Sequence, residues 1–149
     1  MTRHIECIVP ILRVNDLAPS LRFYLDVLGF KRDWGGEPPT SEMAGISRDG
    51  WGLMLCDGAQ GNPGTWVWIG VHDAMALHDQ LKSAGAKIIL PPTNFYWAME
   101  FRVEDPDGHV LRFGSEPDSA QPFANPGYSI RKPAPPATCP IPLPIPPSP

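Results

Sequence analysis

The stretch that decides the fold is residues 97–116, WAMEFRVEDPDGHVLRFGSE. Two strand-like runs, residues 99–104 and 109–114, flank the turn at residues 105–108. Proline presets φ at the first corner of a turn and glycine supplies a positive φ at its end, so this stretch predicts a β-hairpin. The side chain at Arg112, on the second run, bears most directly on function.

A single unit recurs along the chain. Asp16 and Asp73 each stand where a helix N-cap is expected, and Gly29 and Gly85 each follow the end of a helical pattern. The aspartates are 57 residues apart (73 − 16) and the glycines 56 (85 − 29), which indicates an internal repeat. We therefore predict an α+β fold of two βαβββ modules, at about residues 5–57 and 65–116, within one domain spanning residues 1–116.

The expected elements follow from hydrophobic periodicity and turn residues. Pro10 interrupts the first strand and cannot donate to a ladder, so it marks an edge or a bend. Residues 35–40, 58–64 and 91–94 are predicted as loops because of their Gly, Pro or Asn content. Helical faces comprise Leu21, Tyr24, Leu25 and Leu28 in the first module and Leu77, Leu81 and Ala84 in the second. Besides the hairpin, strands are predicted at residues 5–14, 30–34, 43–48, 51–56, 65–71 and 86–90.

Composition narrows the classes of function. The 149 residues suit one domain, and a net charge of −4 without a basic stripe argues against nucleic-acid binding. Cys7, Cys56 and Cys139 are far apart and odd in number, so neither a disulfide framework nor a CxxC metal site is indicated. With no signal-peptide core or membrane-length apolar run, we expect a cytoplasmic protein.

Residues 117–149 have a different composition. They hold twelve of the twenty prolines and end in CPIPLPIPPSP. Such a chain favours polyproline II and lacks the amide donors needed to join a sheet. We interpret these residues as a C-terminal tail outside the domain. The alternative is a docking peptide for an SH3-like partner, although no PxxP motif with a flanking arginine stands out.

Two motifs carry a resemblance to a known family. The segments VPILRVNDLAPSLRFYLDVLGF, at residues 9–30, and FRVEDPDGHVLRF, at residues 101–113, resemble the vicinal oxygen chelate superfamily. That superfamily includes glyoxalase I, extradiol dioxygenases, fosfomycin-modifying enzymes and bleomycin-binding proteins. The resemblance covers about residues 5–116. It implies paired βαβββ modules whose curved sheets enclose a cavity, commonly in a dimer.

The resemblance also says where a metal would bind. Metal-dependent members hold one divalent ion with four His, Gln or Glu side chains, one from each of four strands. Divalent ions of this kind need oxygen and nitrogen ligands, whereas arginine is a fixed cation. We therefore predict no metal, no other cofactor and no catalytic residue of the usual kind. In this sequence the four positions fall on Val9, Cys56 (Met54 if the register slips by two), Trp66 and Arg112.

Strand parity predicts an aromatic pocket in place of a metal site. Trp66, Trp68 and Arg112 should face the cavity. The alternative is that the two tryptophans simply fill the space that a metal site would have left. In bleomycin-binding relatives, two aromatic side chains sandwich a flat part of the drug. Trp34 and Trp97 match those places approximately. The predicted ligand-binding residues are Trp34, Met54, Cys56, Trp66, Trp68, Tyr96, Trp97, Glu100 and Arg112.

These patterns favour a non-catalytic protein of the bleomycin-resistance type. It would sequester a planar, partly cationic small molecule, such as a bleomycin-like or other natural-product antibiotic, at a homodimer interface. Asp33, Glu37 and Glu100 either meet the cationic parts of the ligand or form a solvated rim. In bleomycin-binding relatives the first strand crosses to the neighbouring subunit near a proline, and Pro10 fits that hinge or a plain edge strand. The alternatives are a glyoxalase-like lyase or dioxygenase, and a scaffold protein that recruits a partner through its tail.

Overall fold

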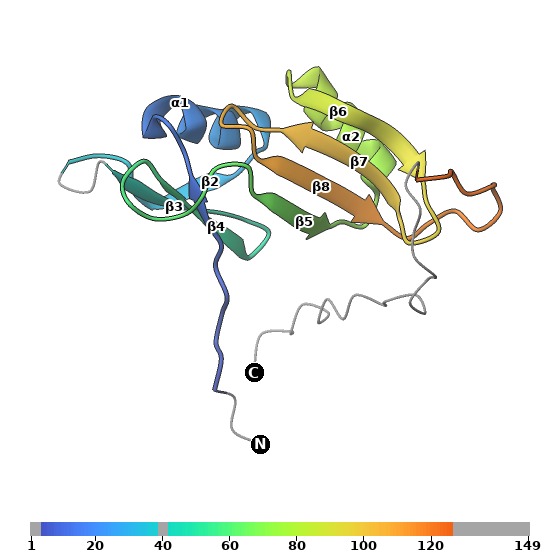
Figure 1. Ribbon diagram of the computed structural model, residues 1–149, viewed down its shortest axis with the longest axis horizontal. Coiled ribbons are helices and arrows are strands. Elements are labelled where there is room, and N and C mark those ends of the chain that lie inside the picture. Colours follow the sequence, from blue (N-terminus) through green and yellow to red (C-terminus); the bar gives the residue numbers. More distant parts are fainter. Residues whose placement is uncertain (1–3, 39–41, 127–149) are drawn as a thin grey trace.

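The computed structural model describes residues 4–38 and 42–126, which form two four-stranded mixed sheets, each with its own helix. The sheets lie side by side along the long axis of the chain (Figure 1). The strand orders, β1-β4-β3-β2 and β5-β8-β7-β6, are the same succession used twice. β1 pairs with β4, and β5 with β8, in parallel, whereas all other neighbouring strands are antiparallel. The α+β fold of two repeated units is thus as predicted.

The elements follow one another in the order expected from the repeat. The first sheet and its helix comprise β1 Ile11–Arg13, α1 Leu17–Arg22 with the π-helical turn η1 Phe23–Val27, β2 Lys31–Gly35, β3 Met43–Arg48 and β4 Trp51–Cys56. The second comprise β5 Trp66–Gly70, α2 Ala74–Ser83, β6 Lys87–Asn94, β7 Met99–Glu104 and β8 Val110–Ser115. No helix among the described residues is long and apolar enough to cross a bilayer.

The helices begin and end at the predicted residues. Asp16 caps the first by accepting the Ala18 N–H at 3.3 Å, and Asp73 caps the second by accepting the Ala76 N–H at 3.0 Å. Gly29 and Gly85 follow the helices with φ of +71° and +93°, which side chains with a Cβ rarely adopt.

One face of each sheet packs on its helix and forms the core. In the second sheet Phe101, Val103, Leu111 and Phe113 are buried on that face, with Val67 and Ile69 packed against them. Because side chains alternate along a strand, the intervening residues Glu100, Arg102 and Arg112 lie on the opposite face. The predicted parity is confirmed, and it leaves one face of each sheet for other uses.

Two of the predicted elements have different bounds. The first strand begins at Ile11, and residues 4–10 extend away from the sheet without regular structure (Figure 1). The prediction of a loop at residues 91–94 is wrong, because β6 continues through Pro91 and Pro92 to Asn94. Two register shifts interrupt its pairing with β7. β6 is an edge strand, where the missing N–H groups of proline leave no neighbour unpaired.

The turn at residues 105–108, which connects β7 and β8, also contacts the first module. Tyr24 Oη donates to Asp105 Oδ2 at 2.7 Å, and the Asn15 N–H donates to Asp107 Oδ1 at 2.7 Å. Burial raises the pKa of Asp105, and the hydrogen bonds that its carboxylate accepts from Tyr24 and from backbone N–H groups offset this only in part. Burial, together with the neighbouring Asp105 charge, likewise raises the pKa of Tyr24. Asp105 and Asp107 therefore link the two modules, and Asp105 does so from a buried position.

His109, directly after this turn, completes the junction. Its Nδ1 accepts the Thr65 N–H at 3.0 Å, so the proton lies on Nε2, which donates to the Arg13 carbonyl at 2.5 Å. The imidazole is fully buried. Both ring nitrogens hold backbone groups of other segments, so His109 has a structural role.

Only the first ten residues of the predicted tail at residues 117–149 are described. Asn94 Nδ2 donates to the Asp118 carbonyl at 2.8 Å, and the Asp118 N–H donates back to Asn94 Oδ1 at 2.9 Å. The Ala124 N–H donates to the Asn94 carbonyl at 2.7 Å. The described part of the tail therefore contacts the end of β6 at Asn94. Residues 127–149, with Cys139, lie outside the described residues.

Candidate ligand-binding site

A buried carboxylate organises the open face of the second sheet. Glu100 lies on β7 and is fully buried. Its Oε1 accepts Arg102 Nε at 2.8 Å and Arg112 Nε at 2.7 Å. Its Oε2 accepts Arg112 Nη2 at 2.8 Å and Trp97 Nε1 at 2.8 Å. Arg112 thus binds the carboxylate with two parallel bonds, the strongest ion-pair geometry of these groups.

These donors keep Glu100 ionised. Burial alone would raise the pKa of its carboxyl group, but hydrogen bonds from Arg112, Trp97 and Arg102 outweigh burial and hold the pKa below its ordinary value. The solvated-rim alternative is wrong for Glu100, because this carboxylate lies beneath two guanidinium groups.

Each arginine also lies over a tryptophan from β5. The guanidinium carbon of Arg102 is 5.3 Å from the ring centroid of Trp66, and that of Arg112 is 5.0 Å from the ring centroid of Trp68. Both distances are within the range of cation–π attraction. The register pairs Arg102 with Arg112 and Trp68 with Arg112, so adjacent strands place these groups in rows. We call this set the charged wall: Trp66, Trp68, Trp97, Glu100, Arg102 and Arg112.

Trp68 has a special place in the charged wall. A Cβ at Gly114, on the neighbouring strand β8, would overlap the Trp68 indole, so the ring lies against bare backbone. Trp68 Nε1 is buried and has no hydrogen-bond partner among the residues that the structure describes. A buried donor without an acceptor costs about 1–3 kcal/mol.

Aromatic side chains cluster before β7. The rings of Phe95 and Trp97 stack at 4.4 Å with an interplanar angle of 6°, and Tyr96 meets Trp97 edge-on at 4.9 Å. One face of the Trp97 ring is therefore covered by Phe95. A planar guest that stacks on Trp97 must use the other face.

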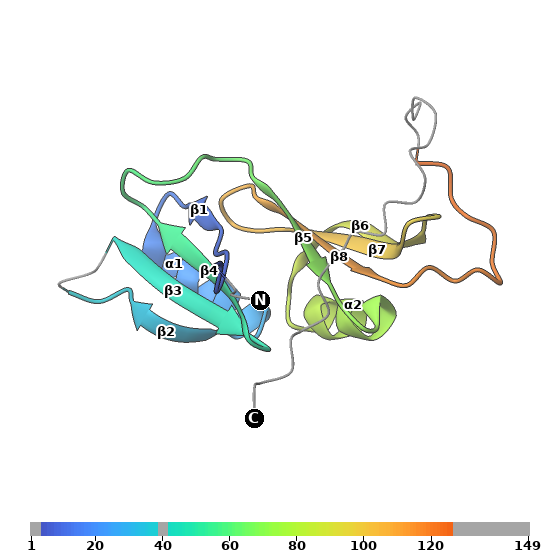
Figure 2. The same cartoon turned by 90° about the horizontal axis from the view of Figure 1, so that it is seen from below.

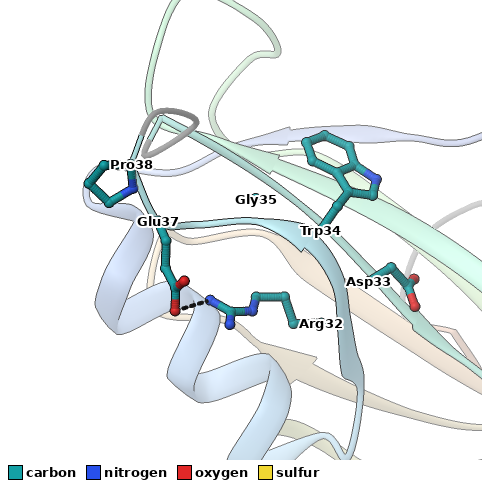
Figure 3. A pocket seen from close by; sticks show the side chains of 6 residues that line it. All are labelled: Arg32, Asp33, Trp34, Gly35, Glu37 and Pro38. Atoms are coloured by element: carbon teal, nitrogen blue, oxygen red, sulfur yellow. Dashed lines mark hydrogen bonds and ion pairs between the residues drawn. The ribbon is translucent and has the colours of Figure 1, made fainter.

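The first sheet presents a different surface around Trp34 on β2. An open pocket of about 350 Å³ is lined by Arg32, Asp33, Trp34, Gly35, Glu37 and Pro38 (Figure 3). Arg32 pairs with Glu37 at 3.0 Å, and Lys31 pairs with Asp33 at 3.4 Å. The Trp34 indole stands apart from the Arg32–Glu37 pair in Figure 3 and lies over Gly45 of β3. The pocket thus combines an aromatic plane with two carboxylates.

The predicted ligand-binding residues fall into two groups. Trp34, Met54 and Cys56 belong to the first sheet, whereas Trp66, Trp68, Tyr96, Trp97, Glu100 and Arg112 belong to the second sheet and the loop before β7. β2 and the β6–β7 loop lie on opposite sides of the junction between the sheets (Figures 1 and 2). Trp34 and Trp97 of one chain therefore do not face each other.

Sequence reasoning missed Arg102. A signal was present, since Arg102 alternates with Glu100 along β7 and the turn at residues 105–108 fixes its partner across the hairpin as Arg112. Placing Arg102 in the site required the cross-strand register in addition to the strand itself.

The superfamily's metal positions carry side chains that do not fit a divalent ion. Val9 precedes β1, Cys56 is buried at the end of β4, and Arg112 is engaged with Glu100. In residues 4–38 and 42–126 no group of three His, Cys, Asp or Glu side chains could hold a metal ion. His78, for its part, packs edge-on against Phe101 at 5.4 Å.

Comparisons with known proteins agree with this architecture. A probable lactoylglutathione lyase of Synechocystis sp. is 29% identical over 117 residues, covering 67% of this chain and 87% of the relative. TnmS3, an antibiotic-binding protein from Streptomyces sp. CB03234, matches with a TM-score of 0.67 at 20% identity, covering 78% of this chain and 100% of that one. The bleomycin-binding protein of Streptomyces verticillus, solved with copper(II)-bleomycin, matches with a TM-score of 0.58 at 25% identity, covering 77% and 98%.

The family model described as Glyoxalase/Bleomycin resistance protein/Dioxygenase superfamily matches residues 3–113. This match includes every residue of the charged wall and confirms the resemblance that the two sequence motifs indicated. The chain therefore belongs to the glyoxalase/bleomycin resistance protein/dioxygenase superfamily.

Proposed function

We propose that this protein binds and sequesters a small molecule, as a non-catalytic member of the bleomycin-resistance type. The observation that carries the proposal is the charged wall. Its two arginines, Arg102 and Arg112, both pair with Glu100, and each lies over a tryptophan ring. Such a surface offers stacking and charge to a planar guest, but no nucleophile beside a base. The antibiotic-binding proteins among the structural matches support a natural-product antibiotic as the guest.

The pocket is proposed to form between two copies of the chain. Trp34 and Trp97 lie on opposite sides of the junction, so both can contact one guest only if they come from different subunits. Residues 4–10 support such an assembly, because they leave β1 in an extended form with Ile5 and Ile8 exposed (Figure 1). Pro10 is the hinge of the proposed exchange, and its carbonyl still accepts the Met54 N–H at 2.9 Å.

The cationic part of the guest is proposed to bind to the first sheet, in the pocket beside Trp34. Asp33 and Glu37 line the pocket beside Trp34. Each pairs with a cation at the surface, Lys31 and Arg32 respectively, whose place a cationic guest could take. A cation stacked on Trp34 would lie near these carboxylates, and cation–π contact would add about 0.5–1 kcal/mol at an exposed position.

An enzymatic role is the second candidate, favoured by the relative named a probable lactoylglutathione lyase. The side chains at Val9, Cys56, Trp66 and Arg112 count against the metal-dependent form of that chemistry. The two candidates differ in whether added metal and substrate give turnover.

Tryptophan fluorescence during titration with a panel of bleomycin-family and other peptide antibiotics tests the proposal. Binding should quench the fluorescence, and Trp34→Ala and Trp97→Ala should each weaken binding about tenfold or more, as expected for removal of an aromatic anchor. Trp51→Ala is the matched control, because Trp51 is an exposed tryptophan at the other end of the first sheet. Turnover of a glutathione-derived hemithioacetal with a stoichiometric divalent metal would instead establish the enzyme.

Light scattering on a size-exclusion column tests the assembly. The full chain should run as a dimer, and removal of residues 1–9 should shift it toward a monomer and weaken antibiotic binding. A monomeric full chain that binds its guest with full affinity would refute the shared pocket.

A further inference from the structure

The charged wall has a surplus of positive charge. Arg102 and Arg112 contribute two positive charges and Glu100 one negative charge, which leaves a net charge of +1. The carboxylate side chain is fully buried, whereas the arginine side chains are 20% and 27% exposed. A guest approaching this face therefore meets the guanidinium groups and not the acid beneath them.

Arg112 alone would neutralise the charge of Glu100. Its Nε and Nη2 donate to both carboxylate oxygens, and Trp97 adds a third donor. Arg102 brings a second cation to a carboxylate that already has its counterion. Holding that surplus charge on a partly desolvated face costs free energy, and a bound anion would offset this cost. Glu100 therefore accounts for the Nε contact of Arg102, but not for the two terminal nitrogens of its guanidinium group.

The terminal nitrogens of Arg102 can bind such an anion. Only its Nε is used on Glu100, and Nη1 and Nη2 have no hydrogen-bond partner in the described part of the chain. The guanidinium lies over the Trp66 ring, a side chain that is itself 57% exposed. The planar fork of an arginine matches the two oxygens of a carboxylate. An aromatic guest on Trp66 would thus bring a carboxylate within reach of Arg102.

The charged wall also contains a buried donor. Trp68 Nε1 is buried without an acceptor, and Trp68 lies under Arg112. Every polar group that the wall contributes besides Glu100 is thus a donor or a cation. An acceptor-bearing guest complements this surface, whereas a further cation does not.

We propose that the charged wall is an anion subsite in which Arg102, supported by Arg112 and Trp66, binds a carboxylate carried by an aromatic guest. This inference rests on the proposed binding function and extends it: a guest that spans both sheets is zwitterionic, with its cation at Asp33 and Glu37 and its carboxylate at Arg102.

A matched pair of probes tests the subsite in the full chain. 2-Naphthoate and 2-naphthamide have the same ring and differ in charge, and their affinities can be compared by calorimetry and tryptophan quenching. Wild-type protein should bind the naphthoate at least about tenfold more tightly. Rising salt should weaken naphthoate binding and leave naphthamide binding unchanged, because screening acts on the charged probe. Equal affinities for the two probes would overturn the proposal.

Two variants locate the effect. Arg102→Met keeps an unbranched side chain over Trp66 and should abolish the preference for naphthoate, whereas Arg102→Lys should retain part of it. Arg22→Met, which removes an exposed arginine from the last turn of α1, is the control and should keep the full preference. A preference that survives Arg102→Met in a protein with unchanged circular dichroism would contradict the assignment.

The outcome separates this inference from the proposed function. Naphthoate selectivity that depends on Arg102, with no antibiotic bound from the panel, would support the subsite and refute the antibiotic. Antibiotic binding that is unaffected by Arg102→Met would support the antibiotic as the guest and refute the anion subsite.

Discussion

The two sheets of this protein share one topology and differ in how they hold charge. In the first sheet the Arg32–Glu37 pair is at the surface, with the Glu37 side chain 72% exposed. In the second sheet Glu100 is fully buried and holds two arginines and a tryptophan. A repeated unit thus reproduces its strand order without reproducing its electrostatics. The difference suggests that the second sheet supplies the fixed part of the pocket and the first sheet an adaptable part.

The largest expected effect comes from removing the buried acid. Glu100→Gln leaves two arginines beside a neutral amide, and removing one partner of a buried pair costs about 3–5 kcal/mol. We expect the lower end of this range, because both guanidinium groups keep some solvent contact. Glu37→Gln in the first sheet should change the free energy of unfolding by no more than about 0.5 kcal/mol. Urea denaturation of both variants measures the contrast, and equal losses would show that the two sheets hold charge in the same way.

The two tryptophan–glycine contacts give the next largest contrast. A Cβ at Gly114 would overlap Trp68, and a Cβ at Gly45 would overlap Trp34. Trp68 is confined by Arg112, so Gly114→Ala should cost about 1–3 kcal/mol, typical of overpacking. Trp34 is exposed and can turn away, so Gly45→Ala should cost less than about 1 kcal/mol. Thermal unfolding of the two alanine variants provides the comparison, and a costlier change at Gly45 would reverse our view of which indole is fixed.

Sequence patterns predicted most of the fold because the signals were local. The caps at Asp16 and Asp73, and the turn at residues 105–108, depend on a few neighbouring residues each. β6 was predicted too short because proline is tolerated only on an edge strand, and edge position is a tertiary property. The first strand was predicted too long, since residues 5–10 have a strand-like pattern but no partner strand among residues 4–38 and 42–126.

The candidate site shows the same limit. The faces of Trp66, Trp68 and Arg112 followed from strand parity alone. The burial of Glu100 and the role of Arg102 did not, because both depend on which residues of three strands become neighbours. A charged residue in a strand is predicted to be solvent-exposed unless its ion-pair partners are known. For this reason the sequence allowed a solvated rim at Glu100, whereas the structure has a buried ion-pair network there.

Two buried carboxyl groups of the second half should respond to pH with opposite signs. The pKa of Glu100 is lowered in the folded state, so its stabilisation is present above the unfolded-state pKa and is lost as pH falls through the folded-state value. The pKa of Asp105 is raised, so its contribution to stability falls as pH rises from the ordinary aspartate range through the raised value.

Urea unfolding at a series of pH values, from about pH 3 to pH 7, separates the two contributions. Glu100→Gln should reduce the loss of stability on acidification, and Asp105→Asn should reduce the loss on alkalinisation. Tyr24→Phe, which removes the Asp105 partner but no carboxyl group, should leave the Glu100 slope intact. Slopes of the same sign for both carboxyl groups would contradict the environments assigned here to Asp105, at the junction of the modules, and to Glu100, in its ion pair.

The smallest expected effect concerns the tail and the end of the second sheet. Removal of residues 117–149 takes away the contacts of Asp118 and Ala124 with Asn94, at the end of an edge strand. Each such hydrogen bond contributes about 0.5–1.5 kcal/mol, and less where water can replace it, so we expect a loss of about 1 kcal/mol with folding retained. Removal of residues 127–149 leaves these three bonds in place and should not change the urea midpoint. If the shorter deletion destabilises the protein as much as the longer one, the stabilising contacts lie beyond residue 126 and not at Asn94.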